Sequence, residues 1–174
     1  VEEYVMGLHY TDEAVKNFIE KIDSINKPIT FVFYGDHLPG IYWDTNNNNI
    51  LHQTDYFIYS NRYARRHLGR RIYRQYDLVA PTDFMSLVQK QTLTKTTPYS
   101  ALLEKVLDEL PVITTKAAAG SKEESDAAMI NDNGELIKYD DLSSSQKELY
   151  NDYKLVQYDM TAGNNYLENM NFTR

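Results

Sequence analysis

An aspartate and a histidine, Asp36 and His37, come just after the β-branched and aromatic run of residues 29–34, separated from it only by Gly35. In open α/β sheets, ligands bind just beyond the carboxyl ends of the strands. A carboxylate supplies a hard anionic oxygen, and a neutral imidazole nitrogen suits transition metals such as zinc or manganese. The pair therefore predicts a divalent metal site. The alternative is a turn in which Asp36 bonds backbone amides and His37 only packs.

Two ligands are too few for a complete metal site, so the other histidines are further candidates. His9 stands four residues before Glu13 in a helical pattern, which is the spacing of a helical metal pair, but a histidine at a helix–sheet contact is the favoured interpretation. His52 precedes a predicted strand and is a candidate to face the same sheet edge as His37. His67 lies among arginines, and we expect it to face solvent.

A strongly basic segment covers residues 62–74 and contains no acidic residue. Its arginines are interleaved with tyrosines and could hold a polyanion, such as a phosphate-bearing polymer or an anionic membrane surface. The alternative is a solvated helix or loop that pairs with the surplus acids of the chain. The candidate polyanion-binding residues are Arg62, Arg65, Arg66, Arg70, Arg71 and Arg74.

The composition narrows the classes of function. The chain has 174 residues, a net charge of −7 and no cysteine. The acidic balance argues against a nucleic-acid binder, and the lack of cysteine excludes disulfides, zinc–thiolate sites and thiol catalysis. The sequence has no Gly-x-Ser-x-Gly elbow and no phosphate-binding glycine loop, so it assigns no catalytic nucleophile. No apolar run approaches the roughly 18–20 residues of a membrane span, and we expect the residues present to be soluble.

The pattern of apolar residues predicts an α/β fold. Apolar residues three and four apart predict a helix over residues 1–25. Residues 29–34 are apolar on both faces, as in an interior strand of a parallel sheet, and a second strand is predicted over residues 54–60. Two further helices are predicted, one after a cap at Thr82 or Asp83 and one over residues 98–110.

The last third of the chain predicts a smaller α+β tail. Residues 114–128 are rich in alanine, glycine, serine and charge, which predicts a flexible loop. Residues 129–139 predict a β-hairpin with an Asn-Gly turn. Ser143 and Gln146 stand at capping-box spacing and open a last helix.

The sequence around the Asp-His pair resembles a known family. The resemblance depends mainly on the stretch Phe-Val-Phe-Tyr-Gly-Asp-His-Leu-Pro at residues 31–39. Weaker matches lie at residues 10–14, 18–19, 54–61, 80–84 and 157–163. They resemble the lipoteichoic acid synthase-like phosphoglycerol transferases, which are membrane-anchored members of the sulfatase and alkaline phosphatase superfamily. The resemblance covers nearly the whole chain but only the carboxyl-terminal part of such a protein.

The resemblance implies a fold and a division of the chain into three parts. We expect the carboxyl-terminal portion of an alkaline phosphatase-like sheet flanked by helices, with the small α+β tail. Residues 1–113 would be the carboxyl-terminal half of a sulfatase-like catalytic domain, residues 114–128 a flexible loop, and residues 129–174 the hairpin and helix. An open sheet edge would favour homo-oligomers.

The resemblance also implies a chemistry. In the family, the aspartate and histidine of this signature bind a divalent cation, commonly manganese, and we carry that role onto Asp36 and His37, with zinc or magnesium as other candidate ions. The family's glutamate ligand and nucleophilic threonine lie upstream of any residue here, so the missing amino-terminal half is an expected partner and the chain alone is expected to be inactive. The implied reaction is transfer of glycerol phosphate from an anionic lipid onto a teichoic-acid-type polymer at the outer face of a bacterial membrane.

Three alternatives remain open from the sequence. The parent protein could be a sulfatase, or a phosphoethanolamine transferase or other phosphodiesterase, of the same superfamily. An upstream cysteine or serine nucleophile would favour a sulfatase, and a threonine a phosphotransferase. The chain could also be a non-catalytic module that binds polyanions, such as an anionic lipid headgroup or a glycerol phosphate polymer, through its arginines and tyrosines.

Overall fold

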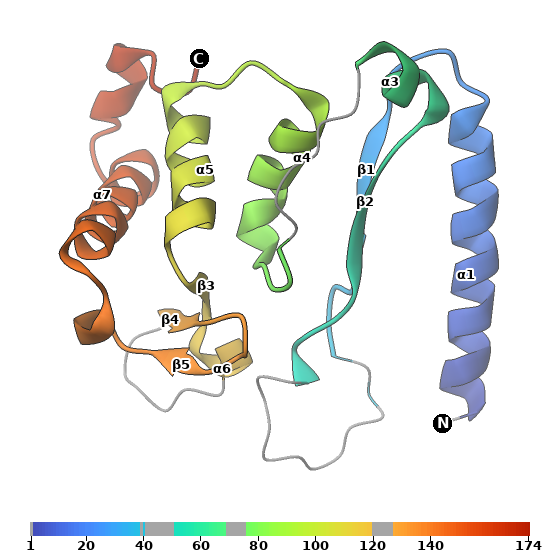
Figure 1. Cartoon of the computed structure of the whole chain (residues 1–174), viewed down its shortest axis with the longest axis horizontal. Helices are drawn as coiled ribbons and strands as arrows, with labels where there is room; N and C mark the ends of the chain where they lie inside the picture. The colour runs from blue at the N-terminus through green and yellow to red at the C-terminus, as the bar shows by residue number, and fades with distance from the viewer. Residues whose placement is uncertain (1, 39, 41–50, 69–75, 120–126) are drawn as a thin grey trace.

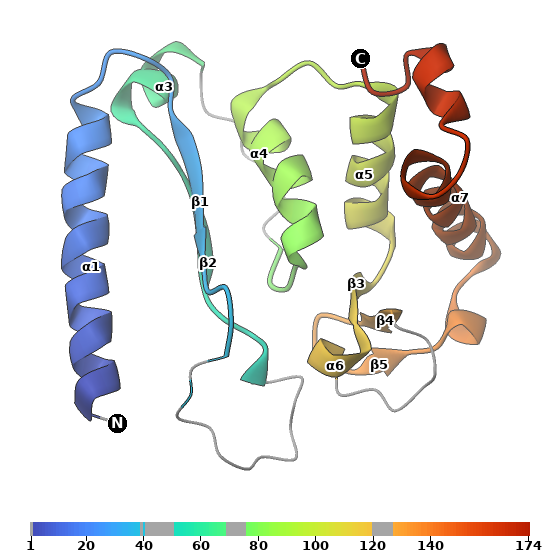
Figure 2. The same cartoon turned by 180° about the vertical axis from the view of Figure 1, so that it is seen from behind.

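The computed structural model describes residues 2–38, 40, 51–68, 76–119 and 127–174. Its elements stand in a row, from α1 through a two-stranded ribbon to α4, α5 and α7 (Figures 1 and 2). A small three-stranded sheet lies at one end of α5 (Figure 1). The architecture is therefore a mixed α/β arrangement with small antiparallel sheets, in line with the predicted α/β class.

The first helix, α1 (Glu2–Asp23), confirms the helix predicted from the amphipathic pattern. Only the second half of its apolar stripe is covered: Ile22 is buried, and Val15 and Ile19 are half-buried. The ring of Phe18 meets that of Phe31 edge to face at 5.1 Å. The amino-terminal half of the stripe is exposed, with Tyr4, Val5 and Leu8 at 37%, 56% and 51%.

The ribbon consists of β1 (Thr30–Tyr34) and β2 (Tyr56–Ser60), which pair antiparallel from Thr30↔Ser60 to Tyr34↔Tyr56. This corrects the prediction of an interior strand in a parallel sheet, since β1 has no second partner among the described residues. Both faces of β1 are apolar because a helix covers each of them. Phe31 faces α1, and Tyr34 packs on Phe84 of α4 at 4.8 Å (Figure 1). An apolar pattern on both faces indicates that both faces of the strand are covered. It does not indicate whether the strand pairs parallel or antiparallel.

Asn61 joins the end of α1 to the end of β2. It is fully buried, and its side-chain amide donates to the carbonyl oxygens of Ile22 and Lys27, both at 2.9 Å. Its Oδ1 accepts the N–H groups of Ile29 and Ala64, and the latter bond caps the short helix α3 (Arg62–His67). Because one buried side chain satisfies backbone groups of three segments, it fixes how α3 leaves the ribbon.

The helix predicted after residue 82 begins as a 3₁₀ turn, η1 (Pro81–Asp83), and continues as α4 (Phe84–Thr92). Asp83, one of the two predicted caps, is the N-cap residue of α4, but its side chain makes no capping hydrogen bond to that helix. Instead, Asp83 Oδ2 accepts the N–H of Ala80 at 2.8 Å, one turn back along the chain. The proline after Ala80 shifts the start of the helix because proline is favoured at the first position.

The helix α5 (Pro98–Glu109) confirms the prediction and packs against α7 (Ser144–Thr161). Their contact forms a hydrophobic core in which Val106 and Leu110 meet Leu149 and Tyr153. The predicted capping box of α7 is also confirmed, since Ser143 Oγ accepts the Gln146 N–H at 3.2 Å and Gln146 Oε1 accepts the Ser143 N–H at 3.1 Å. Two short 3₁₀ helices flank α7, η2 (Tyr139–Asp141) and η3 (Tyr166–Met170).

The predicted hairpin is confirmed as β4 (Ala127–Ile130) and β5 (Leu136–Ile137), with Gly134 at the positive φ of 76° that the turn requires. The predicted loop over residues 114–128 is corrected at both ends. Thr114 and Thr115 belong to β3 (Val112–Thr115), which pairs with β4, and α6 (Lys116–Ala119) follows. β-Branched threonine suits a strand and alanine suits a helix, which accounts for β3 and α6. Ala127 and Ala128 belong to β4 because they pair with Thr115 and Thr114.

Candidate metal centre

Asp36 and His37 lie at the carboxyl end of β1, at the end of the ribbon where α1 begins (Figure 1). Asp36 Oδ1 is 3.5 Å from His37 Nε2, and the two side chains are 82% and 78% exposed. Ligand bonds of about 2.0–2.2 Å that meet at a tetrahedral angle place two donor atoms about 3.4 Å apart. The separation therefore fits two donors that share one cation.

The other ring nitrogen of His37 indicates which form of the imidazole this geometry favours. Nδ1 is 3.0 Å from the carbonyl oxygen of Leu38, so in the neutral ring Nδ1 carries the hydrogen and donates it to that oxygen. Nε2 then presents its lone pair to the Asp36 carboxylate. Two lone pairs at this distance repel unless a proton or a metal cation lies between them. The pair thus has the donor set of a cation site.

Gly35 brings the start of β2 close to this pair. A Cβ on Gly35 would lie 2.8 Å from Thr54 Oγ1 and 3.1 Å from Thr54 Cγ2, inside contact distance. A larger residue at position 35 would therefore require the Thr54 side chain or the backbone at Gly35 to shift. This contact holds Thr54 beside the residue that precedes Asp36.

The other histidines do not complete a site. No group of three or more histidine or acidic side chains within the described ranges is placed to hold a metal ion. His9 is 63% exposed and lies 3.8 Å from Glu13, so it is not at a helix–sheet contact, which corrects the favoured interpretation. His52 is exposed. His67 is exposed as predicted, and it stacks on Tyr63 at 4.0 Å.

The described arginines lie at the opposite end of the ribbon. Because β2 runs from its pairing with Tyr34 to its pairing with Thr30, α3 follows at the end of the ribbon away from Asp36. Arg62 and Arg66 are exposed there, whereas Arg65 is engaged with the protein. Arg70, Arg71 and Arg74 lie outside the described residues. The structure does not bring the described arginines and the Asp-His pair together.

Asp23 also lies at the α3 end of the ribbon, and no pattern in the sequence indicated its role. Its carboxylate accepts the Arg62 N–H at 2.7 Å and the Tyr59 hydroxyl at 2.9 Å, and Arg65 Nη2 is 3.6 Å away. Burial alone would raise the pKa of Asp23, but these two hydrogen bonds and the nearby guanidinium outweigh it and lower the pKa. Asp23 is therefore an ionised structural carboxylate, and it forms an ion pair with Arg65.

A cavity of about 540 Å³ lies next to the Asp-His end of the ribbon. It is lined by residues 54–58, by Tyr76 and Asp77, and by Leu87 of α4. Thr54 lines the cavity and also contacts Gly35, so the cavity adjoins the candidate metal pair. Thr54 and Asp55 were predicted as the first residues of a strand over residues 54–60, but the strand begins at Tyr56, and nothing in the sequence indicated this cavity.

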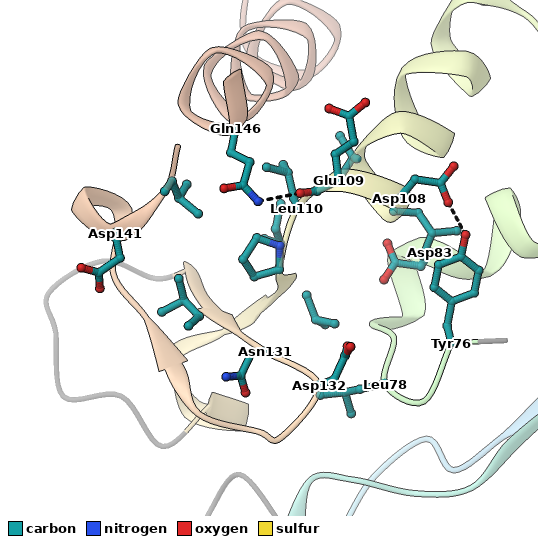
Figure 3. A pocket seen from close by; sticks show the side chains of 17 residues that line it. Tyr76, Leu78, Asp83, Asp108, Glu109, Leu110, Asn131, Asp132, Asp141 and Gln146 are labelled. Carbon is teal, nitrogen blue, oxygen red and sulfur yellow. Dashed lines mark hydrogen bonds between the residues drawn. The ribbon is translucent and has the colours of Figure 1, made fainter. Parts of the chain in front are cut away.

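A second cavity, of about 380 Å³, lies between the end of α5, the three-stranded sheet and residues 76–83 (Figure 3). Neither Asp36 nor His37 lines it. Burial raises the pKa of Asp83 in its wall, although the Ala80 N–H opposes the shift. The hydroxyl of Tyr76 donates to Asp108, which Lys90 Nζ also approaches at 3.0 Å. These contacts fix the wall that separates the two cavities, since Tyr76 lines both.

Comparison with known proteins finds a family model and a solved structure that this chain resembles. Residues 1–88, just over half of the 174, match the model of the sulfatase family. A solved structure of the Streptococcus pyogenes phosphoglycerol transferase GacH, in complex with sn-glycerol-1-phosphate, is 34% identical with a TM-score of 0.64. The match covers 93% of this chain and 35% of that one, so the chain spans about a third of the relative's length. No curated protein matches the chain.

None of the helices in the described ranges has the length and apolar character needed to cross a membrane.

Proposed function

The chain belongs to the sulfatase family, within the alkaline phosphatase superfamily, and from that membership we propose that it is the metal-binding carboxyl-terminal segment of a phosphoglycerol transferase. The observation that carries the proposal is the Asp36–His37 pair, whose donor atoms stand 3.5 Å apart at the end of β1. The likeness to GacH, which is a phosphoglycerol transferase bound to a glycerol phosphate, favours this reaction over sulfate ester or phosphoethanolamine chemistry.

The residues of this chain would hold the cation and orient its ligands. Asp36 would supply an anionic oxygen and His37 its Nε2 lone pair, with manganese as the expected ion and zinc or magnesium as alternatives. The Leu38 carbonyl keeps the imidazole in the form that presents Nε2. A bound divalent cation neutralises charge on phosphoryl oxygens and lowers the pKa of an attacking hydroxyl. The remaining ligands and the nucleophile would come from the other part of a longer, membrane-anchored protein at the outer face of a bacterial membrane.

The partner of this site would be an anionic lipid headgroup or a glycerol phosphate polymer, held by its phosphate through the cation. The arginines would play a separate and smaller part. Arg62 and Arg66 are exposed at the far end of the ribbon and stay candidates for a polyanion contact, while Arg65 is committed to Asp23. A module that binds polyanions only through these arginines is the less favoured alternative because one of the three described side chains is already engaged.

Manganese titration of the chain tests the proposal. We expect weak binding by isothermal titration calorimetry, and the double variant Asp36→Ala/His37→Ala to weaken it by about tenfold or more. The matched control is His9→Ala/Glu13→Ala, which removes another exposed imidazole and carboxylate, 3.8 Å apart, and should leave binding unchanged. Equal affinity of wild type and the Asp36–His37 variant would contradict the assignment.

A further inference from the structure

Resting on that proposed function, we infer that Phe84 of α4 is a positioning residue for the Asp36–His37 pair, because its ring holds the carboxyl end of β1 that the pair follows. Among the described residues, Asp36 and His37 make polar contacts only with each other and with Leu38. Both side chains are mostly exposed. The position of the pair is therefore set by the backbone at the end of β1.

The ring of Phe84 contacts both strands of the ribbon where β1 ends. Its centre lies 4.8 Å from that of Tyr34, the last residue of β1, and 5.5 Å from that of Tyr56, the first residue of β2. Tyr34 and Tyr56 are partners in the antiparallel register, so one side chain packs on the last pair of the ribbon. Tilted aromatic pairs at these distances attract each other. Only Gly35 stands between Tyr34 and Asp36, so a shift of Tyr34 moves the metal pair.

Phe84 and the strand end are themselves held in place. Phe84 is half-buried as the first residue of α4, and Leu87 in the same turn is 1% exposed. The Tyr56 hydroxyl donates to the Tyr76 carbonyl at 3.2 Å. None of these contacts involves the metal pair, so they can order the end of β1 before a cation binds, which reduces the ordering that binding requires.

Manganese titration together with NMR relaxation tests the inference. Phe84→Ala should weaken manganese binding in isothermal titration calorimetry by about threefold or more, because the pair must then be ordered as the cation binds. It should also lower the backbone order parameters of residues 35–38 in the metal-free chain. Phe84→Leu removes both ring contacts but keeps a large apolar side chain, so it carries the test if Phe84→Ala does not fold. Unchanged manganese affinity, or unchanged order parameters, would overturn the inference.

Two controls separate positioning from a general loss of stability. Phe18→Ala is the matched substitution, since Phe18 also packs its ring on β1 from a helix, but at Phe31, five positions before Asp36. Leu149→Ala removes a buried side chain from the core between α5 and α7 and should lower the stability. Both controls should leave the manganese affinity and the order parameters of residues 35–38 unchanged. Equal weakening of manganese binding by Phe84→Ala and by either control would contradict a positioning role.

The proposed function and this inference fail in different ways. If the wild-type chain does not bind manganese at Asp36 and His37, the proposed function fails and Phe84 loses its role in a metal site. If the wild type binds manganese and Phe84→Ala binds it equally well, the metal pair stands and only the positioning role of Phe84 is overturned.

Discussion

The guanidinium of Arg65 lies 3.6 Å from the carboxylate of Asp23 and ties α3 to the end of α1. Arg65 also donates to the Ser60 carbonyl at 2.8 Å, and its charge lies 4.9 Å from the centre of the Tyr59 ring. Its neighbour Arg66 is exposed and contacts none of the described residues through a hydrogen bond or ion pair. Two adjacent arginines of the basic segment thus have different roles, one structural and one facing solvent.

Arg65→Ala should lower the free energy of unfolding by about 1 kcal/mol, since it removes one hydrogen bond, one ion pair and one cation–π contact at a partly exposed site. Arg66→Ala removes the same charge with no described contact and should change the stability by less than about 0.5 kcal/mol. Urea unfolding of both variants measures the difference. Part of the Arg65 effect should disappear at high salt, because the ion pair is screened. Equal effects of the two substitutions would show that the Asp23 contact does not stabilise the fold.

Asp83 should give the stability a dependence on pH. Burial in the wall of the second cavity raises its pKa above the ordinary 3.8, despite the hydrogen bond from the Ala80 N–H. A raised pKa in the folded state means that folding takes up protons, so the Asp83 contribution becomes less favourable as the pH rises above the unfolded value. Asp83→Asn keeps an oxygen for the Ala80 N–H and removes the charge. We therefore expect it to be more stable than wild type at neutral pH, with the gain shrinking as the pH falls toward 3.8.

Urea unfolding at a series of pH values measures this change. Asp132→Asn is the control because Asp132 lines the same cavity but is exposed, and it should not alter the pH dependence. A variant Asp83→Asn that is less stable than wild type at neutral pH would show that the hydrogen bond from Ala80 outweighs the burial of the charge.

Local signals in the sequence predicted local structure. The capping box of Ser143 and Gln146 and the turn at Gly134 involve residues a few positions apart, so spacing alone was enough to find them. The Asp36–His37 pair was found for the same reason. Contacts between distant segments left no such signal. The bonds of Asp23 join residues 36 to 42 positions apart, and the antiparallel pairing of β1 is set by β2, 26 residues further along at Tyr56.

The candidate site shows the same limit. Thr54 and Asp55 were predicted only as the start of a strand, because the place of Thr54 beside Gly35 depends on how the ribbon folds back. Asp77 lines the same cavity, although it lies more than 20 residues further along the sequence. Residues on three separate segments line this cavity, and a single sequence does not report which segments meet.

The contact between Gly35 and Thr54 can be measured by a double-mutant cycle. Gly35→Ala places a Cβ 2.8 Å from Thr54 Oγ1, so either the Thr54 side chain or the backbone at Gly35 must shift, and we expect a loss of about 1 kcal/mol in the free energy of unfolding. Thr54→Ala alone should cost little because Thr54 is exposed. It removes the two closest atoms and leaves Cβ at 3.2 Å, so Gly35→Ala should cost less in the Thr54→Ala background. Urea unfolding of the four proteins gives the coupling, expected at about 1 kcal/mol. Additive losses would mean that Thr54 and Gly35 are not energetically coupled, and the contact that places the cavity beside the residue before Asp36 would then be unsupported.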